Sequence, residues 1–113
     1  MNSLRNRVTL IGRLGAEPVV RTIDGNRKVV RMTLATSDQF MKNGEKTKET
    51  QWHSLVVWGP LCDTCEKYLT KGKEIAVEGK IVYRKWDDKE GNNHFMTEIN
   101  VDNLLMIGGN KEN

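Results

Sequence analysis

Aromatic and basic residues stand side by side at several places in this 113-residue sequence. Trp86 follows directly after Arg84 and Lys85, and Phe40 lies two residues before Lys42. The π-face of tryptophan or phenylalanine can stack on any nucleic-acid base, and each stack contributes about 1–3 kcal/mol. Lysine and arginine neutralise phosphates and release their counterions. Because a duplex hides the faces of its bases, the pattern indicates binding of single strands without sequence preference.

Strand alternation divides the segment 51–58 into two faces. One face carries Trp52 and Trp58, and the other carries Leu55 and Val57, which are typical of a core. A single tryptophan is more often a core residue. Three tryptophans outside the most hydrophobic stretches favour a stacking surface. We predict that bases stack on Phe40, Trp52, Trp58 and Trp86, and that Arg31, Lys42, Arg84 and Lys85 serve the phosphates.

Lys85 raises a geometric question, because alternation places it on the face opposite Trp86. Both residues can serve one bound strand only if the chain curls or bulges at that end.

The elements that position these residues are mostly strands, since alternation dominates the sequence. Predicted strands cover 8–14, 28–36, 51–58, 74–86 and 95–106, with an extended segment at 21–23, a charged loop or hairpin tip at 39–50 and one helix at about 61–70. Five strands with a helix between the third and the fourth match the all-β OB-fold, a partly open Greek-key barrel. Gly12 and Gly79 suit the sharp bends of such a barrel. A plain antiparallel sheet covered by a helix is the alternative.

The predicted helix contains both cysteines, Cys62 and Cys65, in CxxC spacing. Its apolar face is predicted at Leu61, Cys65, Tyr68 and Leu69. A zinc site would need further ligands, and only His53 and His94 remain. The cysteines are therefore interpreted as small helix-face residues. The sequence contains no Walker A motif, paired carboxylates or Ser/His/Asp pattern, so we expect no catalysis, no metal and no cofactor.

Length and composition restrict the class of protein. The length fits one domain, here 1–109, followed by a short tail at 110–113. No apolar run approaches the roughly 20 residues of a membrane helix, and the first residues lack a secretory signal. Two cysteines cannot form a disulfide framework, so a reducing cytosolic setting is expected. Residues 1–48 hold ten basic and four acidic side chains, a net charge of +6, which is compatible with a polyanionic partner.

Ordered segments along nearly the whole chain, from Asn6 to Gly109, carry a family resemblance. They are 6–15 (NRVTLIGRLG), 18–21 (PVVR), 34–37 (LATS), 52–53 (WH), 56–59 (VVWG), 68–72 (YLTKG), 77–79 (VEG) and 84–86 (RKW). In this order and spacing, the sequence resembles the bacterial single-stranded DNA-binding protein family.

The resemblance implies an OB-fold assembled as a homotetramer in the bacterial cytoplasm, associated with the nucleoid. It also implies sequence-independent binding and protection of single-stranded DNA during replication, recombination and repair. Trp52 and Trp86 match two stacking tryptophans of the family. Phe40 stands where many members carry tryptophan, and Trp58 where many carry phenylalanine, so the π-faces are kept. Ser54 departs from the pattern, because a basic residue is common there.

The carboxyl end is the larger departure from the family pattern. Members continue with a flexible segment and an acidic tip that recruits replication and repair enzymes, whereas this sequence stops after Asn110-Lys111-Glu112-Asn113. Two interpretations stay open: a tailless paralogue, as on mobile elements or phages, which the Asn-Lys-Glu-Asn end favours, or a longer chain that was trimmed. In either case we expect the chain as given not to recruit those enzymes. The competing functions are an OB-fold accessory that binds RNA or joins a replication-restart complex, and an enzyme that uses the Cys and His residues.

Overall fold

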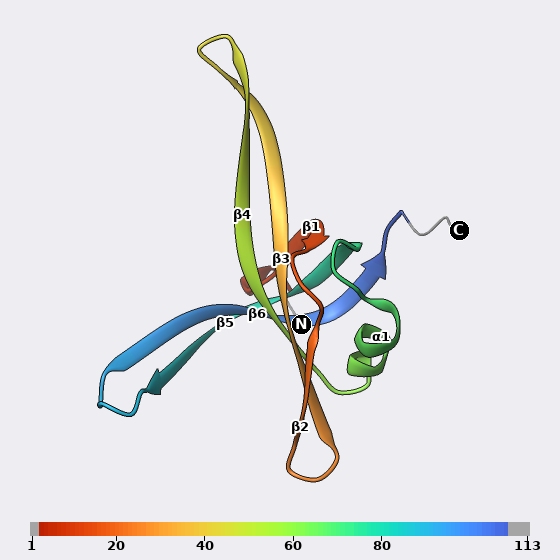
Figure 1. Ribbon diagram of the computed structural model, residues 1–113, viewed down its shortest axis with the longest axis vertical. Helices are drawn as coiled ribbons and strands as arrows, with labels where there is room; N and C mark the ends of the chain where they lie inside the picture. Colours follow the sequence, from red (N-terminus) through yellow and green to blue (C-terminus); the bar gives the residue numbers. More distant parts are fainter. Residues whose placement is uncertain (1–2, 109–113) are drawn as a thin grey trace.

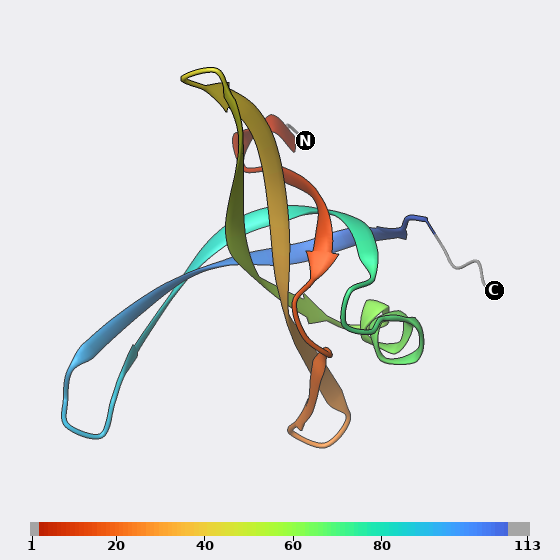
Figure 2. The same cartoon turned by 45° about the horizontal axis from the view of Figure 1, so that its top comes forward.

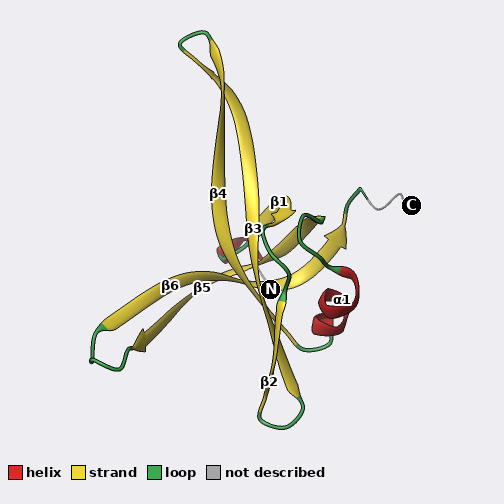
Figure 3. Cartoon of the chain, in the orientation of Figure 1, coloured by secondary structure: helices red, strands yellow, loops and turns green. Residues whose placement is uncertain are grey.

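The computed structural model describes residues 3–108. A short 3-10 turn, η1 (Ser3–Arg5), precedes the strands and one helix (Figures 1 and 3). These elements are β1 (Val8–Leu14), β2 (Val19–Ile23), β3 (Arg27–Lys42), β4 (Glu45–Trp58), α1 (Leu61–Tyr68), β5 (Glu74–Asp87) and β6 (Asn93–Met106). The predicted tail at 110–113 lies outside the described residues. No helix within 3–108 is long and apolar enough to cross a membrane.

Five of the strands close into a barrel. β1 pairs with β5, β5 with β6, β6 in parallel with β4, and β4 with β3. The ring closes where Arg13 and Leu14 of β1 pair with Ala35 and Leu34 of β3. This arrangement confirms the predicted OB-fold and excludes the plain sheet. The predicted strand count omitted one, because the segment predicted only as extended forms β2, a further strand on the edge of β3.

Two strand glycines allow the barrel to close. A Cβ atom on Gly12 would lie 2.2 Å from the carbonyl oxygen of Ala35, and one on Gly79 would lie 2.1 Å from that of Asn100. The β5–β6 register also shifts between Glu78 and Gly79. No side chain fits at such distances, so the prediction that these glycines serve barrel curvature is confirmed.

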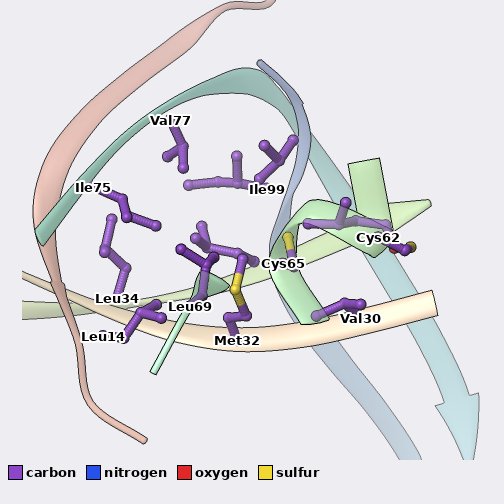
Figure 4. Close-up of a cluster of buried hydrophobic side chains, with 13 residues drawn as sticks. Leu14, Val30, Met32, Leu34, Cys62, Cys65, Leu69, Ile75, Val77 and Ile99 are labelled. Atoms are coloured by element: carbon purple, nitrogen blue, oxygen red, sulfur yellow. The ribbon is translucent and has the colours of Figure 1, made fainter. Parts of the chain in front are cut away.

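The core fills the barrel and the space beneath α1 (Figure 4). Leu34, Val57 and Ile75 are fully buried there, and α1 adds Cys62 and Cys65. The predicted helix face is wrong at Tyr68, which is 58% exposed. The helix ends at Tyr68, and the next residue, Leu69, is extended and buried, so the leucine enters the core instead.

Two hairpins extend beyond the barrel as arms, formed by β3–β4 and β5–β6 (Figures 1 and 2). The segment predicted as a charged loop or hairpin tip at 39–50 is instead a paired ladder that continues to Lys42 and Glu45. The turn is Asn43-Gly44, with both residues at positive φ, as a tight hairpin turn requires. Charged side chains occur on both faces of this arm, so its sequence lacks the apolar alternation that would predict a strand.

Candidate nucleic-acid interface

The outer face of the β3–β4 sheet carries two of the tryptophans. Trp52 pairs with Ala35 and Trp58 pairs with Val29, and the two tryptophans are 61% and 41% exposed. Leu55 is buried on the opposite face, in the core. The predicted division of this segment into a core face and a tryptophan face is therefore confirmed at these residues. Val56, on the tryptophan face, is nevertheless buried.

Trp58 also lines an open pocket of about 720 Å³ near the start of α1. Its lining includes Trp58, Arg27, Lys28 and Asp63. Lys28 is engaged by carboxylates, at 3.3 Å from Asp63 and 2.9 Å from Glu66. Arg27 also has a carboxylate partner, because its guanidinium lies 3.2 Å from the carboxylate of Asp24.

Trp86 on the β5–β6 arm is oriented by its neighbours. Its ring stacks on His94 with centroids 5.1 Å apart, and the guanidinium of Arg84 lies 4.8 Å from its centroid. His94 Nε2 lies 2.8 Å from Asp88 Oδ2. This hydrogen bond, and then the backbone N–H of Asn92, lower the pKa of Asp88 from its ordinary value. The indole contacts both His94 and Arg84 and remains 40% exposed.

Glu98 of β6 connects the basic residues of β3 and β5. Its carboxylate accepts hydrogen bonds from Arg31 Nη1 and from Arg84 Nε, the latter at 3.4 Å, and the residue is only 3% exposed. Both arginine side chains remain 42% exposed. Two cations thus share the single carboxylate of Glu98. Arg31 and Glu98 also line a small groove of about 190 Å³ with Ser54 and Met96.

Sequence reasoning missed Glu98. The residue is an ordinary charged position in a strand pattern, and its burial arises only when β6 is enclosed between β4 and β5.

Glu98→Ala is expected to lower the free energy of unfolding by about 2 kcal/mol, because two guanidinium groups lose a charge-assisted hydrogen bond. Urea unfolding of the variant and the parent measures the difference. Glu90→Ala, at an exposed loop carboxylate, is the matched control and should leave the unfolding midpoint unchanged. Equal midpoints for both variants would contradict a structural role for Glu98.

Three of the predicted binding residues lie on arm faces opposite those of the tryptophans. They are Phe40, Lys42 and Lys85. Phe40 pairs with Thr47, and alternation places it and Lys42 away from the face of Trp52. Lys85 pairs with Phe95 on the face opposite Trp86. The register runs evenly from Gly79 to Asp87, so no bulge in this part of the arm brings Lys85 to the face of Trp86.

The structure thus brings Arg31 and Arg84 together at Glu98, with Trp86 next to Arg84, and it places Trp52 and Trp58 on one face of β4. It does not bring Phe40, Lys42 or Lys85 to these surfaces. Sequence reasoning also missed two exposed aromatic residues, Tyr83 and Phe95. Both alternate with Arg84 and His94, and that alternation was the available signal.

The cysteines lie in the core. Cys62 and Cys65 are both free and buried, and Cys62 Sγ lies 3.2 Å from the carbonyl oxygen of Val57. Burial raises the pKa of Cys65 to about 11. Within residues 3–108, no three His, Cys, Asp or Glu side chains are grouped so that they could hold a metal ion. The interpretation of both cysteines as packing residues on the helix is confirmed.

Cys65 is expected to make stability fall at alkaline pH. Its pKa is about 11 in the fold against 9.0 as the ordinary value, so the folded state holds the thiol proton more tightly. The resulting stabilisation is complete below about pH 9 and is lost as the pH rises towards 11. Urea unfolding at about pH 8 and pH 10.5 should show a smaller loss for Cys65→Ala than for the parent. Parallel losses in the two proteins would disprove this assignment.

Comparison with known proteins agrees with this geometry. The family model described as the single-strand binding protein family matches residues 5–107. A protein of Chlorobaculum tepidum named single-stranded DNA-binding protein 1 is 42% identical over 105 residues, which cover 91% of this chain and 65% of the relative. A Xylella fastidiosa protein of the same name is 37% identical over 110 residues, 96% of this chain and 81% of the relative.

A solved structure described as a Plasmodium falciparum SSB complex with ssDNA superposes with a TM-score of 0.83 and 33% identity, over 95% of this chain and 99% of that one. The present chain spans about two thirds of the length of the Chlorobaculum relative. With a family match from Arg5 to Ile107, and relatives above 30% identity, the chain belongs to the single-strand binding protein family.

Proposed function

We propose that the protein binds and protects single-stranded DNA without sequence preference, and that it does so without catalysis. The observation that carries the proposal is the set of exposed tryptophans: Trp86, which lies against the guanidinium of Arg84, and Trp52 on the outer face of the barrel. Exposed indoles offer π-faces to any base, and Arg84 beside Trp86 attracts a phosphate. The names of the two bacterial relatives and the single-stranded DNA in the Plasmodium complex support the same ligand class.

The biological setting that we propose is replication, recombination and repair of DNA in the bacterial cytoplasm, at the nucleoid. The bacterial relatives and the two free cysteines support this setting.

A fluorescence titration tests the proposed activity. Oligodeoxynucleotides of unrelated sequence should quench tryptophan emission with similar affinity, and the affinity should fall as salt is raised. The same titration with duplex DNA should show much weaker binding. Tighter binding of RNA than of DNA of equal length would instead support a surface that reads the 2′-hydroxyl.

We also propose that the protein assembles as a homotetramer. β1 pairs with β3 only at Arg13 and Leu14, so the backbone of 8–12 faces no second neighbour within the described chain. The outer face beside it exposes Ile11 and, on β6, Leu105. An open strand edge next to exposed apolar side chains is commonly covered by another chain.

Light scattering should therefore give the mass of four chains of 12.9 kDa, about 52 kDa. Ile11→Glu places a charge on the outer face of β1 and should reduce the assembled mass. A parent mass of about 13 kDa across micromolar concentrations would reject the assembly.

A further inference from the structure

A row of touching side chains runs along the face of the β5–β6 arm that carries Trp86. The imidazole of His94 occupies the middle of this row, with its Nε2 atom 2.8 Å from Asp88 Oδ2. Its ring stacks on the indole of Trp86, with the centroids 5.1 Å apart and the planes inclined by 21°. Arg84 ends the row, with its guanidinium 4.8 Å from the indole centroid. A titratable ring therefore lies between a carboxylate and the indole on which we propose that a base stacks.

The turn after β5 holds Asp88 in place as an anion. Asp88 Oδ1 accepts hydrogen bonds from the backbone N–H groups of Glu90 and Asn92, each at 2.9 Å. The hydrogen bond from His94, and then that from the backbone of Asn92, lower the pKa of Asp88 below its ordinary value. Histidine exchanges its proton between about pH 5 and about pH 8. Asp88 stays negatively charged throughout that range, so the charge that changes in this row belongs to the imidazole.

His94 is the one ion-pair partner of Asp88 within residues 3–108. Arg84, the cation at the far end of the row, is hydrogen-bonded to Glu98, which also accepts a hydrogen bond from Arg31 of β3. A neutral imidazole therefore leaves the charge of Asp88 uncompensated, close to where a phosphate must pass if a base stacks on Trp86. A protonated imidazole balances that charge, and it also adds a cation–π contact to the indole.

The other charged groups at this end of the arm lie outside the row. Lys85 and Asp87 lie on the opposite face by alternation, and Lys89 and Glu90 are exposed in the turn. β4, the other neighbour of β6, pairs with it only at Ile99 and Asn100, so it brings no charge to His94. Asp88 and a bound phosphate are thus the anions that act on a proton at His94.

We propose that His94 is a proton-linked positioning residue: its protonated ring pairs with Asp88 and steadies Trp86, and binding of single-stranded DNA takes up a proton at His94. This inference rests on the proposed function and adds to it a dependence on pH. A phosphate near the ring favours the charged imidazole, and by linkage the charged imidazole favours the bound phosphate to the same extent. The affinity should therefore rise as the pH falls through the range of histidine.

The test measures the affinity of the full chain for an oligothymidylate, whose bases do not titrate in this range, at about pH 7.5 and about pH 5.5 and at one low salt concentration. The affinity should rise about fivefold at the lower pH, as one unit charge a few ångströms from a phosphate provides in a water-like dielectric. His94→Phe keeps a ring against Trp86 but carries no proton, so its affinity should change little with pH. His94→Arg carries a permanent charge, so at the higher pH it should bind as tightly as the parent does at the lower pH.

His53→Gln is the matched control, because His53 is the other histidine of the chain. Its Nε2 atom lies 2.9 Å from Thr36 Oγ1, and glutamine can keep that hydrogen bond. This variant should retain the full pH dependence of the parent. Calorimetry in two buffers of different ionisation enthalpy measures the proton directly. At about pH 6.5, the parent should take up part of a proton per chain on binding DNA, and His94→Phe should take up none.

A parent affinity that is equal at the two pH values overturns the proposal. So does a His94→Phe protein whose affinity or proton uptake follows the parent, because the proton then belongs to another group. Loss of the pH dependence in His53→Gln has the same consequence. If the parent binds the oligonucleotide at neither pH, the proposed function itself fails, and that result is distinct from the others.

Discussion

Trp52→Ala and Trp86→Ala are each expected to weaken binding of single-stranded DNA by about 1–3 kcal/mol for each base that loses its stack. The loss should depend little on sequence, because every base has a π-face. Both indoles are at least 40% exposed, so their removal should alter folding far less than the 3–5 kcal/mol that is typical of a buried tryptophan. Fluorescence titration gives the affinity, and urea unfolding gives the stability.

Conservative variants separate stacking from folding. Trp52→Phe keeps a π-face and should retain most of the affinity, whereas Trp52→Ala should not. Phe40→Ala tests whether a bound strand reaches the far face of the β3–β4 arm, and we expect a smaller loss there. A Trp86→Ala protein that unfolds readily, yet binds DNA normally when it is cooled and folded, would refute the stacking role.

Gly12→Ala is expected to destabilise the barrel by about 3 kcal/mol. The new Cβ would lie 2.2 Å from the carbonyl oxygen of Ala35, and that oxygen belongs to the β1–β3 closure. A backbone atom cannot move away without opening the ring. The thermal midpoint of unfolding, measured by circular dichroism, should fall. In fluorescence titrations, the amount of DNA bound should fall only in proportion to the folded fraction of the protein.

Gly15→Ala is the matched control, because its Cβ would meet a side chain instead of the backbone. The nearest atom is in the ring of Trp52, at 2.5 Å. An exposed ring can rotate away, so this variant should keep most of its stability and lose DNA affinity through a displaced Trp52. Equal destabilisation by the two substitutions would contradict the distinction between them.

Several features were predictable because they depend on local periodicity. Alternation over 51–58 predicted that Leu55 and Val57 are buried and that Trp52 and Trp58 are exposed, and the structure agrees. A strand with one face on a core repeats every two residues, so its sequence reports its faces directly. Gly12 and Gly79 within strand segments likewise predicted the sharp bends of a barrel. The structure shows close backbone approaches at both positions that leave no room for a Cβ atom.

The helix and the arms were less predictable, since their patterns carry less information. Tyr68 fits an apolar helix face by spacing, yet the helix ends there and Leu69 takes the buried position. The segment 39–50 has no apolar face, because both faces of its arm meet solvent. The two strands of this arm are held by the backbone pairing of β3 with β4 and by the Asn43-Gly44 turn.

The sequence by itself determined the strands of the barrel, the inward and outward faces of β4, and the kinship with single-strand binding proteins. Only the tertiary structure decided that Glu98 is buried between Arg31 and Arg84, and that Lys85 faces Phe95 on the far side of the arm from Trp86. The physical reason is that burial of a side chain depends on which strands enclose it. Local periodicity assigns a residue to a face, but the closure of the barrel and the length of each arm beyond it determine whether that face is packed or open to a ligand.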